Sequence, residues 1–170
     1  MAIDINIIKK GQDATYEDWR NEFYRYYESC EISDKIKRIN DEVKCMGRPS
    51  NLNEFGFAPF KEDIKKCVNM RVRLSEISRL LHNLKSNLKI IYDNMVFFLR
   101  MEPRISGRTK EDRKKNAEIE SLKEFLLLKN LENSYEKVEE LKEVYKIKYE
   151  AVSRALSIVD YERKQISRES

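Results

Sequence analysis

Seven cationic side chains crowd a short segment near the middle of the chain, which also contains a Pro and a Gly. This set, here called the basic turn, consists of Arg100, Arg104, Arg108, Lys110, Arg113, Lys114 and Lys115. Such cations repel one another unless an anionic partner relieves the repulsion, and arginine suits bidentate contacts with phosphate. The segment therefore predicts contact with a nucleic-acid backbone, although no aromatic residue within it offers a surface for stacking bases.

The positive charge is concentrated in the middle third of the chain. Residues 61–116 contain 15 basic and 7 acidic residues, a net charge of +8, whereas the flanking segments are each net −2 and the whole chain is +4. Arg71 and Arg73, on the predicted helix before the turn, extend the candidate phosphate-binding set. Cations beside a coiled-coil seam also serve partner choice and solubility, so both interpretations stay open for these two residues.

Few residues suggest catalysis. His82 is the only histidine, and it directly follows an apolar position of a helical pattern, which favours a packing or surface role. Carboxylates that could bind a divalent metal for nuclease chemistry are interleaved with lysines at spacings that favour surface ion pairs; they are Glu136, Glu139, Glu140 and Glu143. The motifs for a nucleophile or a phosphate loop are missing, so we expect no enzyme, no metal and no cofactor.

Aromatic side chains recur near the start of the chain. Tyr16, Trp19, Phe23 and Tyr26 follow a 3,4 spacing, which places them on one face of a helix. That spacing favours a core or an interface over a ligand cage. If the face is an interface, Trp19 and Phe23 are the candidate partner-binding residues.

Capping residues and turn residues divide the first part of the chain. A helix is expected from Thr15, where TYED matches a capping box, and a break at EISDK, where Ser33 can cap a second helix that ends at Gly47. Residues 1–8 alternate as in a short strand, and the apolar residues of loop 51–60 predict that it docks onto a helix. We therefore expect an N-terminal part, 1–60, and a helical hairpin, 61–170.

An unbroken 3,4 repeat dominates the hairpin. It consists of Cys67, Met70, Leu74, Ile77, Leu81, Leu84, Leu88, Ile91, Met95 and Phe98. This seam predicts a supercoiled helix from Pro59 to Met101, a turn over 102–110, and a second helix from Thr109 to near the end of the chain. The expected fold is all-α: a long antiparallel helical hairpin of coiled-coil type, with an N-terminal helical segment and a short strand-like arm.

The long seam and the unpaired arm also predict a homo-oligomer. The three cysteines form no C-x-x-C pair, and the longest apolar run is far below membrane-spanning length. We therefore expect a cytoplasmic protein without a membrane partner.

The segment RISGRTKEDRKKNAEIESL resembles the UvsY-type recombination mediators of tailed phages. The similarity covers residues 90–168 and consists of a basic first helix, a Gly-containing turn, the pair Asp112–Arg113 followed by Glu118 and Ile119, and a terminal helix. It implies a ring-forming homo-oligomer in the host cytoplasm that binds single-stranded DNA and helps load a recombinase onto strands coated by single-strand binding protein. The DNA contacts that it implies are Arg108, Arg113, Lys114 and Lys115.

A different class of function stays open. The chain could be a phage-type interaction protein, such as an inhibitor of a host defence complex or a virion assembly adaptor, that works through protein contacts at Trp19 and Phe23. A metal-dependent nuclease is the third alternative. The sequence does not separate DNA from RNA as the polyanion.

Overall fold

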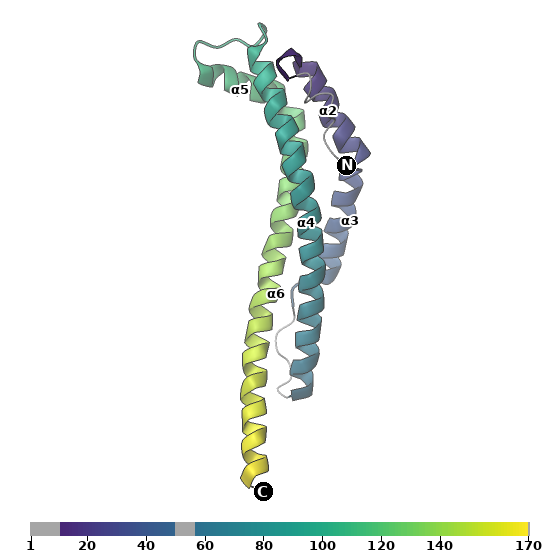
Figure 1. Ribbon diagram of the computed structural model, residues 1–170, viewed down its shortest axis with the longest axis vertical. Helices are drawn as coiled ribbons and strands as arrows, with labels where there is room; N and C mark the ends of the chain where they lie inside the picture. Colours follow the sequence, from purple (N-terminus) through teal and green to yellow (C-terminus); the bar gives the residue numbers. More distant parts are fainter. Residues whose placement is uncertain (1–10, 50–56, 170) are drawn as a thin grey trace. The chain divides into compact units, whose positions relative to one another are not determined.

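The computed structural model describes residues 11–49 and 57–169, and every regular element in these two ranges is helical. A 3-10 turn, η1 (Gly11–Asp13), precedes α2 (Tyr16–Ser29), α3 (Ile32–Met46), α4 (Phe57–Met101), α5 (Lys110–Glu120) and α6 (Leu122–Glu169) (Figure 1). The all-α prediction is confirmed. The strand-like arm predicted at residues 1–8 lies outside the described residues, as does most of loop 51–60.

Helix α2 begins where its capping residues predict. The Thr15 backbone N–H donates to Asp18 Oδ2 at 2.9 Å, and Thr15 Oγ1 accepts from the Asp18 backbone N–H at 3.2 Å. These reciprocal bonds satisfy amides that have no partner within the helix. The predicted capping box is confirmed.

The break between α2 and α3 lies close to its predicted position, but Ser33 does not cap the second helix. Glu31 has a φ of +49°, in the left-handed region that ends helices, and α3 starts at Ile32. At the other end Gly47 has a φ of +60°, and the Tyr145 hydroxyl donates to the Met46 carbonyl at 3.1 Å. A glycine and a side-chain donor therefore terminate α3.

The apolar seam of α4 forms the core. Eight of its ten residues are buried, and Met70 and Phe98 are half-buried. Four α6 residues with a seven-residue spacing are buried as well: Leu131, Val138, Tyr145 and Val152. The 3,4 pattern therefore identifies the buried face of α4.

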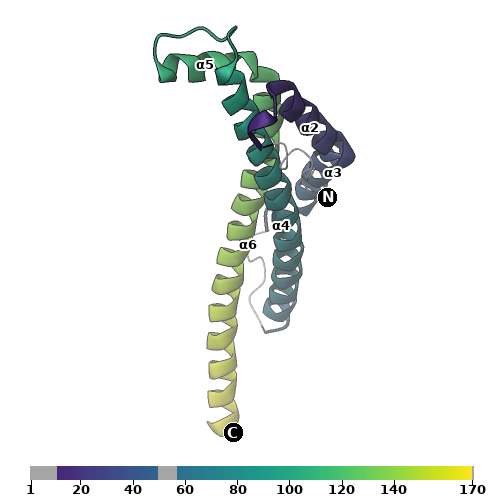
Figure 2. The same ribbon diagram turned by 45° about the horizontal axis from the view of Figure 1, so that its top comes forward.

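One expectation for the second long helix is wrong, because the chain breaks at Ser121 between α5 and α6. Ser121 has a φ of −98° and a ψ of +21°, and its hydroxyl donates to the Ala117 carbonyl at 2.9 Å. The hydroxyl also lies 3.3 Å from that of Tyr92 on α4. Helix α5 consequently turns away from the direction of α6 (Figures 1 and 2).

Contacts divide the chain into two compact units. Among the described residues, the first consists of 11–40 and 80–135, and the second of 41–49, 57–79 and 136–169. Inside each unit the segments of α4 and α6 run antiparallel. His82 lies beside Tyr135 and Tyr92 beside Ser121 in the first unit.

A buried carboxylate connects α2 to α6 in the first unit. Glu124 is 1% exposed, and it accepts hydrogen bonds from Arg20 Nε at 3.1 Å and from the Tyr24 hydroxyl at 2.8 Å. Burial, reinforced by the bond to Glu124, raises the pKa of Tyr24 to about 12, so the phenol remains a proton donor at neutral pH. These two bonds fix α2 against the start of α6.

Candidate nucleic-acid interface

The backbone of the basic turn is held by several local contacts. Thr109 and Asp112 form a capping box at the start of α5, with both bonds at 3.1 Å, which confirms the predicted restart. The Asn116 side chain donates to the Ser106 carbonyl at 2.6 Å, and Ile105 is buried. The connection between α4 and α5 therefore presents its cations from a defined backbone.

Gly107 lies so close to α5 that no side chain fits there. A Cβ atom at this position would be 2.7 Å from the backbone nitrogen of Arg113. We expect Gly107→Ala to displace the start of α5 and to lower the free energy of unfolding by about 1–3 kcal/mol, as overpacking does. Urea unfolding followed by circular dichroism measures this loss. The exposed neighbour Ser106→Ala is the control, and equal stability of both variants would contradict the close approach.

Two cations of the basic turn are already engaged, and a third is partly buried. Arg104 bonds Glu102 at 2.6 Å, and its guanidinium lies 5.3 Å from the ring centre of Tyr16. The bond to Glu102 raises the pKa of Arg104. Lys114 pairs with Glu118 at 3.7 Å. Arg100 is half-buried, and its Nε is shielded from solvent without a hydrogen-bond partner in the described part of the chain.

The other four cations of the turn are exposed. Arg108, Lys110, Arg113 and Lys115 make no side-chain hydrogen bond or ion pair with any residue in 11–49 or 57–169. A surface cation that lacks an internal partner keeps its full capacity to bind an anion. These four residues are therefore the part of the predicted set that is best placed to contact phosphate.

Arg71 and Arg73 belong to the second unit and are engaged there. Arg73 holds Glu42 with bonds of 2.6 and 3.0 Å and also contacts Glu76 at 3.2 Å. Arg71 lies 5.1 Å from the ring centre of Tyr149. Neither residue is part of the basic turn, and both have structural partners of their own.

The aromatic face of α2 is core. Phe23 is completely buried, and Trp19 is 7% exposed and stacks on Phe98 with 6.4 Å between ring centres. This placement corrects the partner-binding assignment of Trp19 and Phe23, since neither side chain is open to a partner. The 3,4 spacing of these aromatic residues therefore reflects their packing in the core.

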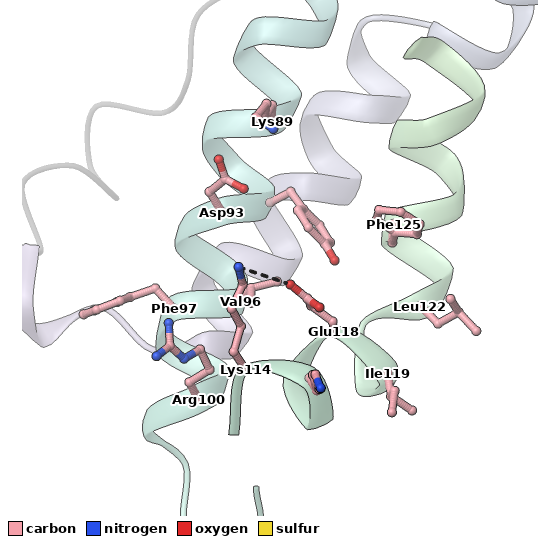
Figure 3. A pocket seen from close by; sticks show the side chains of 12 residues that line it. Lys89, Asp93, Val96, Phe97, Arg100, Lys114, Glu118, Ile119, Leu122 and Phe125 are labelled. Carbon is pink, nitrogen blue, oxygen red and sulfur yellow. Dashed lines mark ion pairs between the residues drawn. The ribbon is translucent and has the colours of Figure 1, made fainter. Parts of the chain in front are cut away.

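An apolar groove adjoins the basic turn in the first unit (Figure 3). It has a volume of about 740 Å³ and lies between the last turns of α4, α5 and the first turns of α6. Its apolar lining includes Phe97, Ile119, Leu122 and Phe125, which are 51%, 69%, 51% and 41% exposed. Four cations also line it: Lys89, Arg100, Lys114 and Lys115.

The sequence does not predict the groove, because it predicts one continuous helix after Thr109. The break at Ser121 turns α5 aside and leaves these apolar side chains exposed. One indication was present in the sequence: Phe97 lies between the seam positions Met95 and Phe98, and Ile119 and Leu122 precede the seven-residue pattern of α6. Apolar residues off the seam are candidates for surface contacts.

Comparisons of the chain with protein families, with curated proteins and with solved structures found no match. Among the described residues, no helix has an apolar stretch that would cross a bilayer. The same residues contain no group of three or more His, Cys, Asp or Glu side chains arranged around a possible metal position. His82 is exposed, with its ring centre 5.8 Å from that of Tyr135.

Proposed function

We propose that this chain is a non-catalytic nucleic-acid-binding accessory protein and that the basic turn is its phosphate-binding surface. The observation that supports this most is the set of four exposed cations, Arg108, Lys110, Arg113 and Lys115, which have no partner within the described residues. Their backbone is fixed by the capping box of α5 and by Asn116. Contacts of this kind supply the salt-dependent part of nucleic-acid affinity.

The resemblance to UvsY-type mediators supports the finer part of the proposal. It favours single-stranded DNA as the polyanion and the loading of a recombinase as the role, in the host cytoplasm of a phage. The proposal includes a homo-oligomer and a coiled-coil hairpin formed by α4 and α6. The buried seam of α4 supports the hairpin, because it supplies the apolar surface that such packing needs.

A triple variant tests the phosphate contacts. We expect Arg108→Ala, Lys110→Ala and Arg113→Ala together to leave the helix content unchanged, because exposed positions rarely alter stability by more than about 0.5 kcal/mol. Affinity for a labelled single-stranded oligonucleotide should fall, and the slope of log K against log salt should become shallower by up to roughly 2, at about 0.7 per lost contact. Fluorescence anisotropy at several salt concentrations measures both quantities.

A second triple variant supplies the matched control. Lys129, Lys142 and Lys146 lie on α6 and are each paired with a nearby glutamate, at 3.2, 2.7 and 2.8 Å. Their replacement by Ala changes the net charge equally but should leave the salt slope near that of the original chain. If both triple variants lost the same oligonucleotide affinity and salt slope, the effect would be one of net charge, and the basic turn would not be the binding site.

A protein-interaction role is the alternative, and the exposed apolar groove is the observation that favours it. Binding of a host defence complex or a virion component would then use the groove in place of Trp19 and Phe23. Such binding should change less with salt than phosphate contact does, because salt does not screen the burial of apolar surface.

A further inference from the structure

We infer that the apolar groove beside the basic turn is a docking site for an acidic amphipathic helix of a partner protein. The groove lies wholly within the first unit, between α4, α5 and α6. Its residues are distinct from the four exposed cations of the turn except for Lys115. The inference therefore does not depend on nucleic-acid binding.

The lining of the groove fits the apolar face of a helix. Phe97, Ile119 and Leu122 are each at least half exposed, and Phe125 is 41% exposed. Side chains of this size are usually covered when they gather around one concave surface, and exposed patches of this kind mark interaction sites. A helix with apolar residues at i, i+3, i+4 and i+7 would cover them along its length.

The charges around the groove select an acidic partner. Lys89, Arg100, Lys114 and Lys115 line it against the carboxylates of Asp93 and Glu118, so the lining has a net positive charge. One ion pair within the lining joins Lys114 to Glu118 at 3.7 Å (Figure 3). Acidic side chains along the flank of a docked helix would meet the remaining cations.

Arg100 adds an observation that points to a missing acceptor. Its Nε is shielded from solvent and has no hydrogen-bond partner among the residues that the structure describes, although its guanidinium lies at the groove. A shielded donor without an acceptor is unfavourable, because it has lost its hydrogen bond to water. A carboxylate of the docked helix would bring an acceptor to this guanidinium.

The lining favours a protein helix over a nucleic-acid strand as the occupant. Half of the exposed apolar lining is aliphatic, Ile119 and Leu122, which suits the apolar face of a helix better than the stacking of bases. A helix can place its carboxylates opposite the cations and away from Asp93 and Glu118, whereas a nucleic-acid backbone carries a negative charge at every nucleotide. The polyanion is therefore assigned to the exposed turn, and the helix to the groove.

A designed peptide tests the docking site on the full chain. The probe is a fluorescein-labelled helical peptide with Leu at i, i+3, i+4 and i+7 and Glu at most other positions. Two control peptides carry the same composition in scrambled order, or Lys in place of Glu. We expect the acidic amphipathic peptide to raise the anisotropy and both controls to bind at least about tenfold more weakly. The scrambled peptide lacks a continuous apolar face, and the Lys peptide is repelled by the cations of the groove.

Variants of the chain locate the binding. Phe97→Ser with Leu122→Ser should weaken peptide binding at least about tenfold and leave oligonucleotide binding unchanged. The triple change at Arg108, Lys110 and Arg113 should weaken oligonucleotide binding and leave peptide binding unchanged. The two sets of variants therefore distinguish failure of the docking site from failure of the phosphate site. Ile119→Ser, at the most exposed apolar position of the lining, gives a second test if the double variant does not fold.

Three results would overturn the inference. One is equal binding of the acidic and scrambled peptides, and another is peptide binding that survives both groove variants in folded protein. The third is a groove variant that weakens oligonucleotide binding and leaves the peptide unaffected, because the groove would then belong to the nucleic-acid strand.

Discussion

Replacement of Phe23 by Ala is expected to lower the free energy of unfolding by about 3–5 kcal/mol, the usual loss for a buried Phe. Phe23 is completely buried in the first unit, and its ring lies 6.5 Å from that of Tyr92. The smaller side chain would leave a cavity that α2 and α4 cannot close without moving. Urea unfolding followed by far-ultraviolet circular dichroism measures the loss.

Phe97→Ala is the matched control, because it removes the same atoms from a side chain that is 51% exposed in the same unit. We expect this variant to change stability by no more than about 0.5 kcal/mol. If Phe23→Ala were as stable as Phe97→Ala, Phe23 would be a surface residue, and the partner-binding assignment made from the sequence would regain support.

Glu124→Ala should produce the second large loss of stability. The substitution deprives Arg20 and the Tyr24 hydroxyl of their common acceptor inside the first unit. A lost bond to a buried charged group costs about 1–3 kcal/mol. The loss should stay below the larger values known for fully buried ion pairs, since the Arg20 side chain is 42% exposed and can be hydrated.

A double-mutant cycle separates this bond from the packing of the Glu124 side chain. Arg20→Ala alone, Glu124→Ala alone and the two together give the coupling energy between the residues. Glu124→Gln should lose less than Glu124→Ala, because the amide retains an oxygen acceptor for Tyr24. Additive losses in the cycle would mean that the Arg20–Glu124 contact does not contribute to stability.

Local physical rules account for most of the helix boundaries. Thr15 and Thr109 each precede an acidic residue by three positions, and both form the capping boxes that this spacing predicts. Gly47 ends α3 with a positive φ, and the 3,4 seam of α4 is its buried face. These features depend on neighbours in the sequence or on one helical period, so the sequence contains the information.

The break at Ser121 could not be predicted in this way. Its hydroxyl bonds the Ala117 carbonyl, which is local, but it also lies beside the Tyr92 hydroxyl from a different helix. An apolar pattern that continues across a single irregular residue looks like one helix. The groove exists because α5 turns aside at this break, so a sequence analysis that misses the break also misses the groove.

The candidate site could be predicted only in part from the sequence. The sequence identifies a cationic turn, but it does not show which of its cations are engaged. Arg104 is held by Glu102 and lies beside Tyr16, whereas Arg108 and Arg113 have no partner in the described residues. Spacing along the chain could not distinguish these two situations, because Arg108 also has acidic residues nearby in the sequence, Glu111 and Asp112, and does not pair with them.

The central claim is tested most directly by titrating the unmodified chain with labelled single-stranded and duplex oligonucleotides at about 50 and 200 mM salt. If all four exposed cations contact phosphate, affinity for the single strand should fall by about 50-fold between these concentrations, at roughly 0.7 of log slope per contact. The duplex should bind more weakly than the single strand at both salt concentrations. Absence of binding at the lower salt concentration, or an affinity that salt does not change, would contradict the account.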